Sequence, residues 1–259
     1  MSKLRRSGSN IPTEDEGTKK QVTDLKAGIR FNALEIIVNK MPKKIIALDE
    51  LYKTDPRVNK KLEEVASVFE RDFAAYLAAK PKPKGEDEKA AEEEEEEEKP
   101  PAAKRTKGSQ GEIPSNTLNE ELMALLRGEL IELLELVNTV KTWIQLNIPK
   151  IEDGNNFGVD IQEEIVSELG RVEESGFNDF EEFTKYYIAR AKLVTKCIKY
   201  PNMGDYKNAV YELDKKQYLT MRILVLDLRN SYSILYDTIQ KNIEKIKNPR
   251  SSDHIDRLY

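Results

Sequence analysis

Histidine and cysteine are almost absent from this sequence, which contains one of each. A single cysteine, Cys197, excludes a disulfide framework within the chain and fits a reducing compartment. The single histidine, His254, lies in a polar stretch after Pro249, with no nucleophile oriented beside it. The sequence also lacks a glycine-rich phosphate loop, a paired-cysteine motif and a Glu-x-x-His motif. We therefore expect no catalytic residue, no metal ion and no cofactor, and the chain is predicted not to be an enzyme.

Long apolar runs are lacking as well. No stretch of about 18 apolar residues occurs, and the amino terminus has no apolar segment of the kind found in secretory signals. These absences predict a soluble, intracellular protein without a membrane segment. Charged residues make up 34% of the chain but the net charge is only −5, so charges of both signs are expected on solvated helix faces. This balance argues against a nucleic-acid surface.

Apolar residues recur at spacings of three and four, which predicts an almost entirely α-helical protein. Three long helices are expected after residue 116, the first capped by Asn116 or Thr117. Pro149, Pro201 and Pro249 mark the ends of these helices. Long helices joined by short connections must be antiparallel neighbours. The predicted fold class is therefore all-α, an elongated up-and-down four-helix bundle, with helices long enough to pack against other subunits.

The composition divides the chain into five segments. Residues 1–16 are predicted to be a disordered amino terminus, and residues 17–79 form the first helical region, interrupted at Pro42. Residues 80–116 contain several prolines and seven consecutive glutamates, so we expect a disordered insert within one bundle. The remaining three helices occupy residues 117–248, and residues 249–259 form a tail.

A connection of unusual composition, residues 149–158, joins the first two of these three helices. Pro149 disfavours helical geometry at Ile148, and two glycines allow backbone angles that other residues resist. No nucleophile or histidine lies nearby, so the loop is predicted to recognise a partner. Its candidate residues are Lys150, Ile151, Glu152, Asp153, Gly154, Asn155, Asn156, Phe157 and Gly158.

Counted from Asp153, the same segment matches part of a calcium-binding loop. Asn155, Gly158 and Glu164 then fall at positions three, six and twelve. Phe157, however, stands at position five, where an oxygen ligand is required. We therefore do not expect a calcium site here.

Residues 141–159 and 161–164, KTWIQLNIPKIEDGNNFGV and IQEE, closely resemble the activation-loop region of the REG, or eleven-S, family of proteasome activators. The likeness continues through residues 186–196, 200–201, 204–206, 241–247 and 249–252, ends at Leu258 and Tyr259, and is greatest for the gamma branch. Before residue 117 it is weaker. The proline-rich segment that usually follows the first helix in this family is absent, and a helical piece from about residue 59 to residue 79 stands in its place.

The resemblance implies a homo-heptameric ring that caps the alpha-subunit ring of the 20S proteasome. It implies that the ring opens the proteasome gate without ATP and stimulates the hydrolysis of peptides or proteins. Residues 149–158 would then be the activation loop, and Arg257, Leu258 and Tyr259 would dock the tail. A helical scaffold or tether without effect on any peptidase is the alternative interpretation.

Lys192 is a candidate for the wall of a central channel. The resemblance points to it because the gamma branch shares a lysine here, whereas the alpha branch has an acidic residue. Spacing alone favours an ordinary solvated lysine, since Lys192 falls outside the apolar stripe of Tyr187, Val194 and Ile198.

A short basic cluster, Lys104, Arg105 and Lys107, lies within the predicted insert. It resembles a nuclear-import signal. We therefore expect the protein in the nucleus, with the cytoplasm as the alternative.

Overall fold

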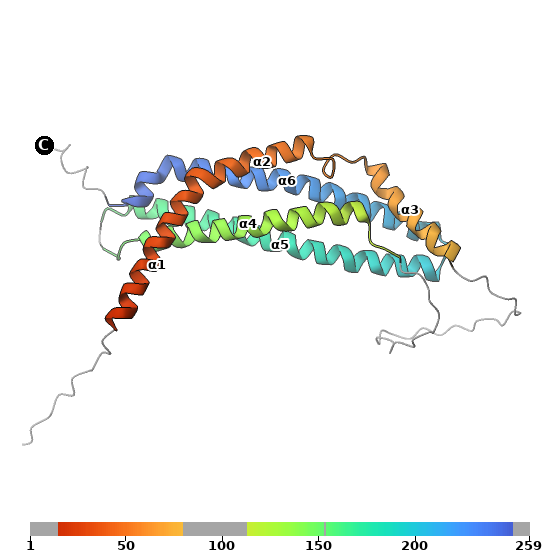
Figure 1. The fold of residues 1–259 in the computed structure, drawn as a ribbon, viewed down its shortest axis with the longest axis horizontal. Coiled ribbons are helices and arrows are strands. Elements are labelled where there is room, and N and C mark those ends of the chain that lie inside the picture. The colour runs from red at the N-terminus through yellow and green to blue at the C-terminus, as the bar shows by residue number, and fades with distance from the viewer. Residues whose placement is uncertain (1–14, 80–112, 153, 251–259) are drawn as a thin grey trace, which may run out of the picture.

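Long antiparallel helices form an elongated bundle in a computed structural model that describes residues 15–79, 113–152 and 154–250 (Figure 1). The elements are α1 (Glu16–Glu35), the π-helical segment η1 (Ile36–Lys40), α2 (Met41–Thr54), α3 (Leu62–Ala79), α4 (Thr117–Asn147), α5 (Phe157–Lys199) and α6 (Gly204–Lys247). No strand occurs within the described ranges. The all-α prediction is therefore confirmed, with α1, η1 and α2 together forming the first helix of the bundle.

The predicted interruption at Pro42 is wrong, because the helical backbone runs through this residue from η1 into α2. Proline has no N–H group, and its ring conflicts with the carbonyl four residues earlier in a regular α-helix. The π-helical turn just before Pro42 widens the backbone, and the Met41 N–H donates to the Ile36 carbonyl five residues back. This local rearrangement accommodates the proline within a continuous helix.

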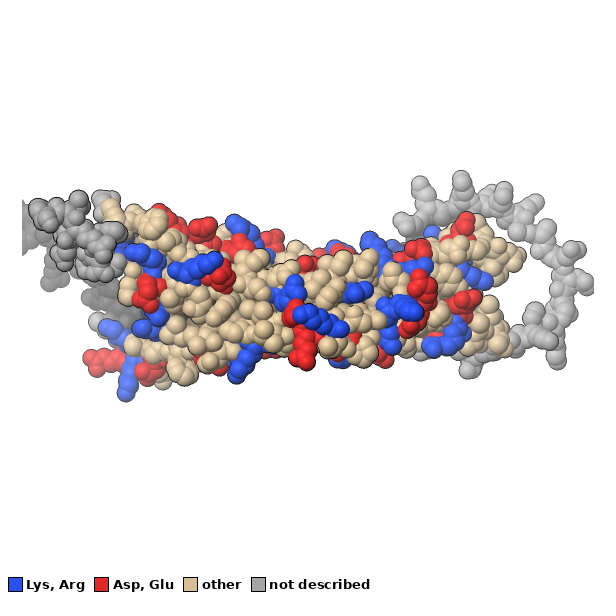
Figure 2. All heavy atoms as spheres, turned by 90° about the horizontal axis from the view of Figure 1, so that it is seen from above, with Lys and Arg blue, Asp and Glu red and all other residues tan. Residues whose placement is uncertain are grey.

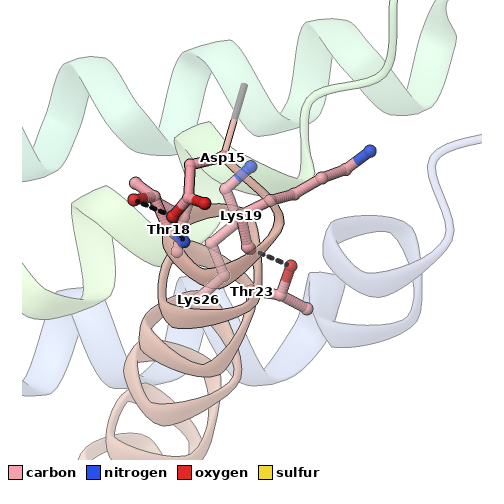
Figure 3. Close-up of a pocket in the computed structure, with 6 residues that line it drawn as sticks. Asp15, Thr18, Lys19, Thr23 and Lys26 are labelled. Carbon is pink, nitrogen blue, oxygen red and sulfur yellow. Dashed lines mark hydrogen bonds between the residues drawn. The ribbon is translucent and has the colours of Figure 1, made fainter. Parts of the chain in front are cut away.

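Helix α1 begins at an aspartate cap, two residues inside the segment predicted to be disordered. The Asp15 carboxylate accepts hydrogen bonds from the Thr18 N–H at 3.0 Å and the Thr18 hydroxyl at 3.1 Å (Figure 3). Among the described residues, those that line the surface hollow at this position belong to this cap and the first turns of α1. In Figure 1, α1 leaves the bundle at an angle, and Val22 and Leu25 are exposed on it.

Helix α3 follows the first helix, at the position where relatives of the resembled family usually carry a proline-rich segment. It lies along α6, and its Phe69 and Phe73 form a second apolar cluster with Val194, Cys197 and Val210. Cys197 is 1% exposed, and its burial raises the pKa of the thiol, so it is a packing residue.

The turn between α2 and α3 is held by a hydroxyl from α6. Tyr218 donates to the Arg57 carbonyl at 2.9 Å and accepts from the Lys60 N–H at 2.7 Å. The ring of Tyr218 itself is fully buried in the main core. The end of the first helical region is thus anchored to the bundle.

The other boundary of the predicted insert also differs from expectation. Residues 80–112 lie outside the described residues, but residues 113–116 are packed against the bundle rather than part of a disordered insert. Ile113 contacts the second apolar cluster, and Asn116 is fully buried. The Asn116 side chain caps α4 by accepting from the Asn119 N–H, which confirms one of the two predicted caps.

Lysine, arginine and acidic side chains are interspersed over the face shown in Figure 2, with uncharged stretches between them. This is the mixed pattern that the small net charge predicts. Across the described ranges, every helix is too short or too polar to span a bilayer.

Candidate functional site

The loop between α4 and α5 has a well-defined backbone, as predicted from Pro149 and Gly154, whereas the second predicted glycine, Gly158, is helical. Helix α4 ends at Asn147, and Ile148 adopts an extended conformation before Pro149, as the proline requires. Gly154 and Asn155 both have positive φ angles, 84° and 48°. Glycine tolerates this region freely and asparagine more readily than most residues. Two successive left-handed residues give the loop a sharp reversal.

Helix α5 begins at Phe157, so the last two residues assigned to the loop form its first turn. The Asn156 carbonyl accepts from the Val159 N–H at 2.8 Å and the Asp160 N–H at 2.9 Å, and these bonds start the helix. Gly158 is therefore helical rather than part of a flexible connection. Its lack of a side chain has another cause, which is the position of Pro249.

Pro249, just after α6, packs directly against Gly158. A β-carbon built on Gly158 would lie 2.1 Å from the Pro249 carbonyl oxygen and 2.7 Å from the Pro249 Cα. No side chain fits at this distance, so only glycine permits the approach. The contact joins the first turn of α5 to the first residues of the predicted tail.

Arg250 makes a second contact between these segments. Its guanidinium donates to the Glu152 carboxylate at 3.0 Å and to the Asn156 side-chain carbonyl at 3.3 Å. The Arg250 side chain is 19% exposed, whereas that of Glu152 is 47% exposed and also pairs with Lys150 at 2.9 Å. The loop and the chain after α6 are thus linked by both packing and charge.

The buried side-chain amide of Gln162 links three helix ends beside the loop. The Gln162 side chain is fully buried and donates to the Ile246 carbonyl at 2.8 Å and the Asn147 carbonyl at 3.4 Å. It therefore ties the ends of α4 and α6 to the beginning of α5. We name the whole arrangement the loop–tail junction, and it consists of Glu152, Asn156, Gly158, Gln162, Pro249 and Arg250.

The loop exposes apolar groups to solvent. Ile151 is 100% exposed and Phe157 is 69% exposed. Exposed apolar side chains on a held loop are typical of a surface that contacts another protein. Ile151 and Phe157 are therefore candidates for contact with a partner protein.

The structure describes only some of the predicted site residues. Asp153 lies outside the described residues, as do the tail residues Arg257, Leu258 and Tyr259 and the basic cluster Lys104, Arg105 and Lys107. Lys192 is described and is exposed on α5. It follows the start of α5 by 35 residues, about 50 Å along the helix axis, so the structure does not bring it near the loop.

A buried polar network was missed by the sequence analysis. Asp214 on α6 is 0% exposed, and its carboxylate accepts from Tyr186 at 2.9 Å, Arg190 at 3.1 Å and Asn116 at 2.8 Å. Asn119 donates to the Tyr186 hydroxyl and to the Asp214 carbonyl. Burial and the Asp214 carboxylate raise the pKa of Tyr186, which keeps its hydroxyl a neutral donor.

Arg190 extends this network to α3 and to the residues just before α4. Its guanidinium donates to the Pro114 carbonyl at 3.2 Å and lies 5.5 Å above the centre of the Phe69 ring. Arg190 is only 5% exposed.

The buried face of α5 differs from the predicted apolar stripe. Tyr186 and Cys197 are buried, while the predicted Tyr187 and Ile198 are only partly buried.

Potential metal ligands are scattered. Within the described ranges, no three histidine, cysteine or acidic side chains are grouped closely enough to hold a metal ion. Glu164, the twelfth position of the rejected calcium pattern, is an exposed residue on the second turn of α5.

Comparison with known proteins identifies the family. Residues 112–256 match the sequence model of the C-terminal region of the proteasome activator PA28, and residues 16–68 match its N-terminal region. The chain belongs to the PA28 family of proteasome activators. Its similarity to the human proteasome activator complex subunit 3 is 38% identity over 243 residues, covering 92% of this chain and 95% of that protein. The chicken subunit 3 gives the same identity and coverage.

Solved structures agree with this PA28 assignment. The crystal structure of the 11S subunit of the Plasmodium falciparum proteasome, PA28, has a TM-score of 0.70 and 35% identity, covering 95% of this chain and all of that one. An activator named P26, in complex with an archaeal 20S proteasome, is 14% identical with a TM-score of 0.52 over 92% of this chain and 99% of that one. That second likeness concerns the fold alone.

Proposed function

We propose that this chain assembles into a homo-heptameric ring that caps the 20S proteasome and opens its gate without ATP. The observation that carries the proposal is the exposed loop held beside the end of α6, in a chain of the PA28 family. The protein acts as a regulator and performs no catalysis. It stimulates hydrolysis by giving substrate peptides or proteins access to the proteasome interior.

The geometry suits a multivalent contact with the alpha-subunit ring. Seven copies of a loop with a fixed shape would present Ile151 and Phe157 at the same distance from the ring axis. Contacts that are weak singly then act together, because the first contact raises the effective concentration of the others. The tail residues Arg257, Leu258 and Tyr259 would supply the tether, with the terminal carboxylate as the recognised group.

A peptidase assay tests this proposal. The purified chain is titrated into 20S proteasome with a fluorogenic peptide, and proteasome binding is followed by co-sedimentation. We expect stimulation by the unmodified chain, strong binding but weak stimulation by Asn155→Tyr, and loss of binding when residues 257–259 are deleted. Asn155 has a positive φ, so a bulky residue there disturbs the loop without touching the bundle. A chain that never stimulates the peptidase would instead fit the helical scaffold or tether.

For Lys192 we propose a place on the wall of the channel through the ring. Seven exposed lysines at one height would create a positive field in a confined space. Lys192→Glu is then expected to change the ratios of stimulated cleavage after basic, acidic and apolar residues, with assembly intact. The change should be largest at low salt, because ions screen exposed charges. Unchanged ratios at low salt would place Lys192 on the outer face of the ring.

We also propose that the protein resides in the nucleus. The proposal rests on the basic cluster Lys104, Arg105 and Lys107 and on the gamma-like sequence after residue 117. Alanine at the three basic positions is expected to move a fluorescent fusion toward the cytoplasm. If the variant stays nuclear, this cluster is not the import element.

A further inference from the structure

The loop–tail junction places a charged side chain from the end of α6 against the loop itself. Arg250 donates to Glu152 and to Asn156, which flank the two residues with positive φ. Its neighbour Pro249 is fixed against Gly158 at a distance that admits no side chain. The backbone leading into the tail is therefore held at the base of the loop.

We propose that Arg250 is a positioning residue for proteasome activation: it holds the loop in its activating shape and couples the loop to the anchored tail. This inference rests on the proposed function. It adds a physical link between the tail, which is proposed to dock on the proteasome, and the loop, which is proposed to trigger gate opening.

The charges around Arg250 favour this role. Glu152 lies between two cations, with Lys150 on one carboxylate oxygen and Arg250 on the other. Lys150 is 84% exposed, so its pair with Glu152 is expected to contribute little, whereas the less exposed Arg250 also bonds Asn156. Two donors of one planar guanidinium fix the relative position of two residues, which a lone surface pair does not do.

If this role is correct, loss of Arg250 should affect maximal stimulation much more than the activator concentration that gives half-maximal stimulation. Loss of Arg250 leaves residues 251–259 intact, so the concentration of activator that gives half-maximal stimulation should change by less than about twofold. Maximal stimulation at saturation should fall by roughly fivefold, the upper range for loss of one partly exposed ion pair. A merely structural role in the bundle would not separate the two quantities.

The experiment titrates full-length variants against 20S proteasome with a fluorogenic peptide. Arg250→Ala and Glu152→Gln are each expected to lower maximal stimulation. The double variant is expected to be no worse than Arg250→Ala, because Arg250→Ala already removes the contact with Glu152. The charge swap Arg250→Glu with Glu152→Arg should recover at least about half of the stimulation. Arg57→Ala is the matched control, since Arg57 pairs with Asp55 in the turn between α2 and α3 and should leave stimulation unchanged.

A second measurement needs no proteasome. Lys150 precedes the fully exposed Ile151, so trypsin can cut between them, and mass spectrometry can follow the fragment that begins at Ile151. We expect Arg250→Ala to speed this cut by roughly fivefold, because the loop opens more often.

Normal maximal stimulation by Arg250→Ala would overturn the inference, as would a change confined to the half-maximal concentration or an unchanged rate of cutting after Lys150. If the unmodified chain fails to stimulate, the proposed function fails and the positioning role fails with it. If the unmodified chain stimulates and Arg250→Ala does so equally, only the positioning role is lost.

Discussion

Replacing Asp214 by alanine is expected to destabilise the protein by about 3–5 kcal/mol, because the change leaves a buried arginine without its counter-charge. Arg190 is 5% exposed and cannot reach water without disrupting the packing of Phe69. Tyr186 and Asn116 lose an acceptor at the same time. We expect the midpoint of urea unfolding, followed by circular dichroism at one fixed protein concentration, to fall strongly.

Two variants show whether the cost arises from the unpaired charge. Asp237→Ala removes a carboxylate that pairs with Lys241 on the exposed surface of α6, and it should change the free energy of unfolding by less than about 0.5 kcal/mol. The double variant Arg190→Met with Asp214→Leu should be more stable than Asp214→Ala, since it removes both charges. Equal midpoints for Asp214→Ala and Asp237→Ala would show that the network contributes little.

Gly158→Ala is expected to reduce proteasome stimulation severely, by about tenfold or more, because alanine cannot occupy the space beside Pro249. The added carbon would overlap the Pro249 carbonyl, so the start of the tail or the first turn of α5 must shift. A shift of about 1 Å in a positioned group can cost two orders of magnitude in rate in enzyme sites, which sets the scale for a positioned loop. The measurement is maximal stimulation together with the half-maximal activator concentration, both of which should worsen.

Gly170→Ala is the matched control in the same helix. A β-carbon at Gly170 meets no atom within 4 Å, so alanine there should stabilise α5 by up to about 1 kcal/mol and leave stimulation normal. Helix propensity favours alanine over glycine at both positions. If Gly158→Ala also stabilised the protein and stimulated normally, the close contact with Pro249 would have no functional role.

Features governed by local rules could be predicted from the sequence. Pro149 fixes the extended conformation of Ile148, and Asn116 caps α4, because each effect depends on residues within a few positions. Periodic apolar spacing gave the long helices for the same reason. The helical path through Pro42 was missed because it depends on a π-helical turn, which has no pattern of its own in the sequence.

Features that join distant segments could not be predicted. The contact between Gly158 and Pro249 spans 91 positions, and no spacing rule relates the two. Arg190 and Asp214 left a weak signal, since each interrupts an apolar stripe: Arg190 lies four residues from both Tyr186 and Val194. A charge on a buried stripe indicates a buried partner but does not identify it.

The π-helical turn at Ile36–Lys40 bears on how this chain should be aligned with its relatives. A π turn accommodates one more residue than an α turn, so it is the structural equivalent of a single-residue insertion in a helix. A relative that lacks one residue here would carry a regular α-helix, and its residues upstream would be rotated by about 100° relative to the bundle. A gap in an alignment of the first helix therefore belongs within these five positions, where the backbone absorbs the difference, and not in the regular turns on either side.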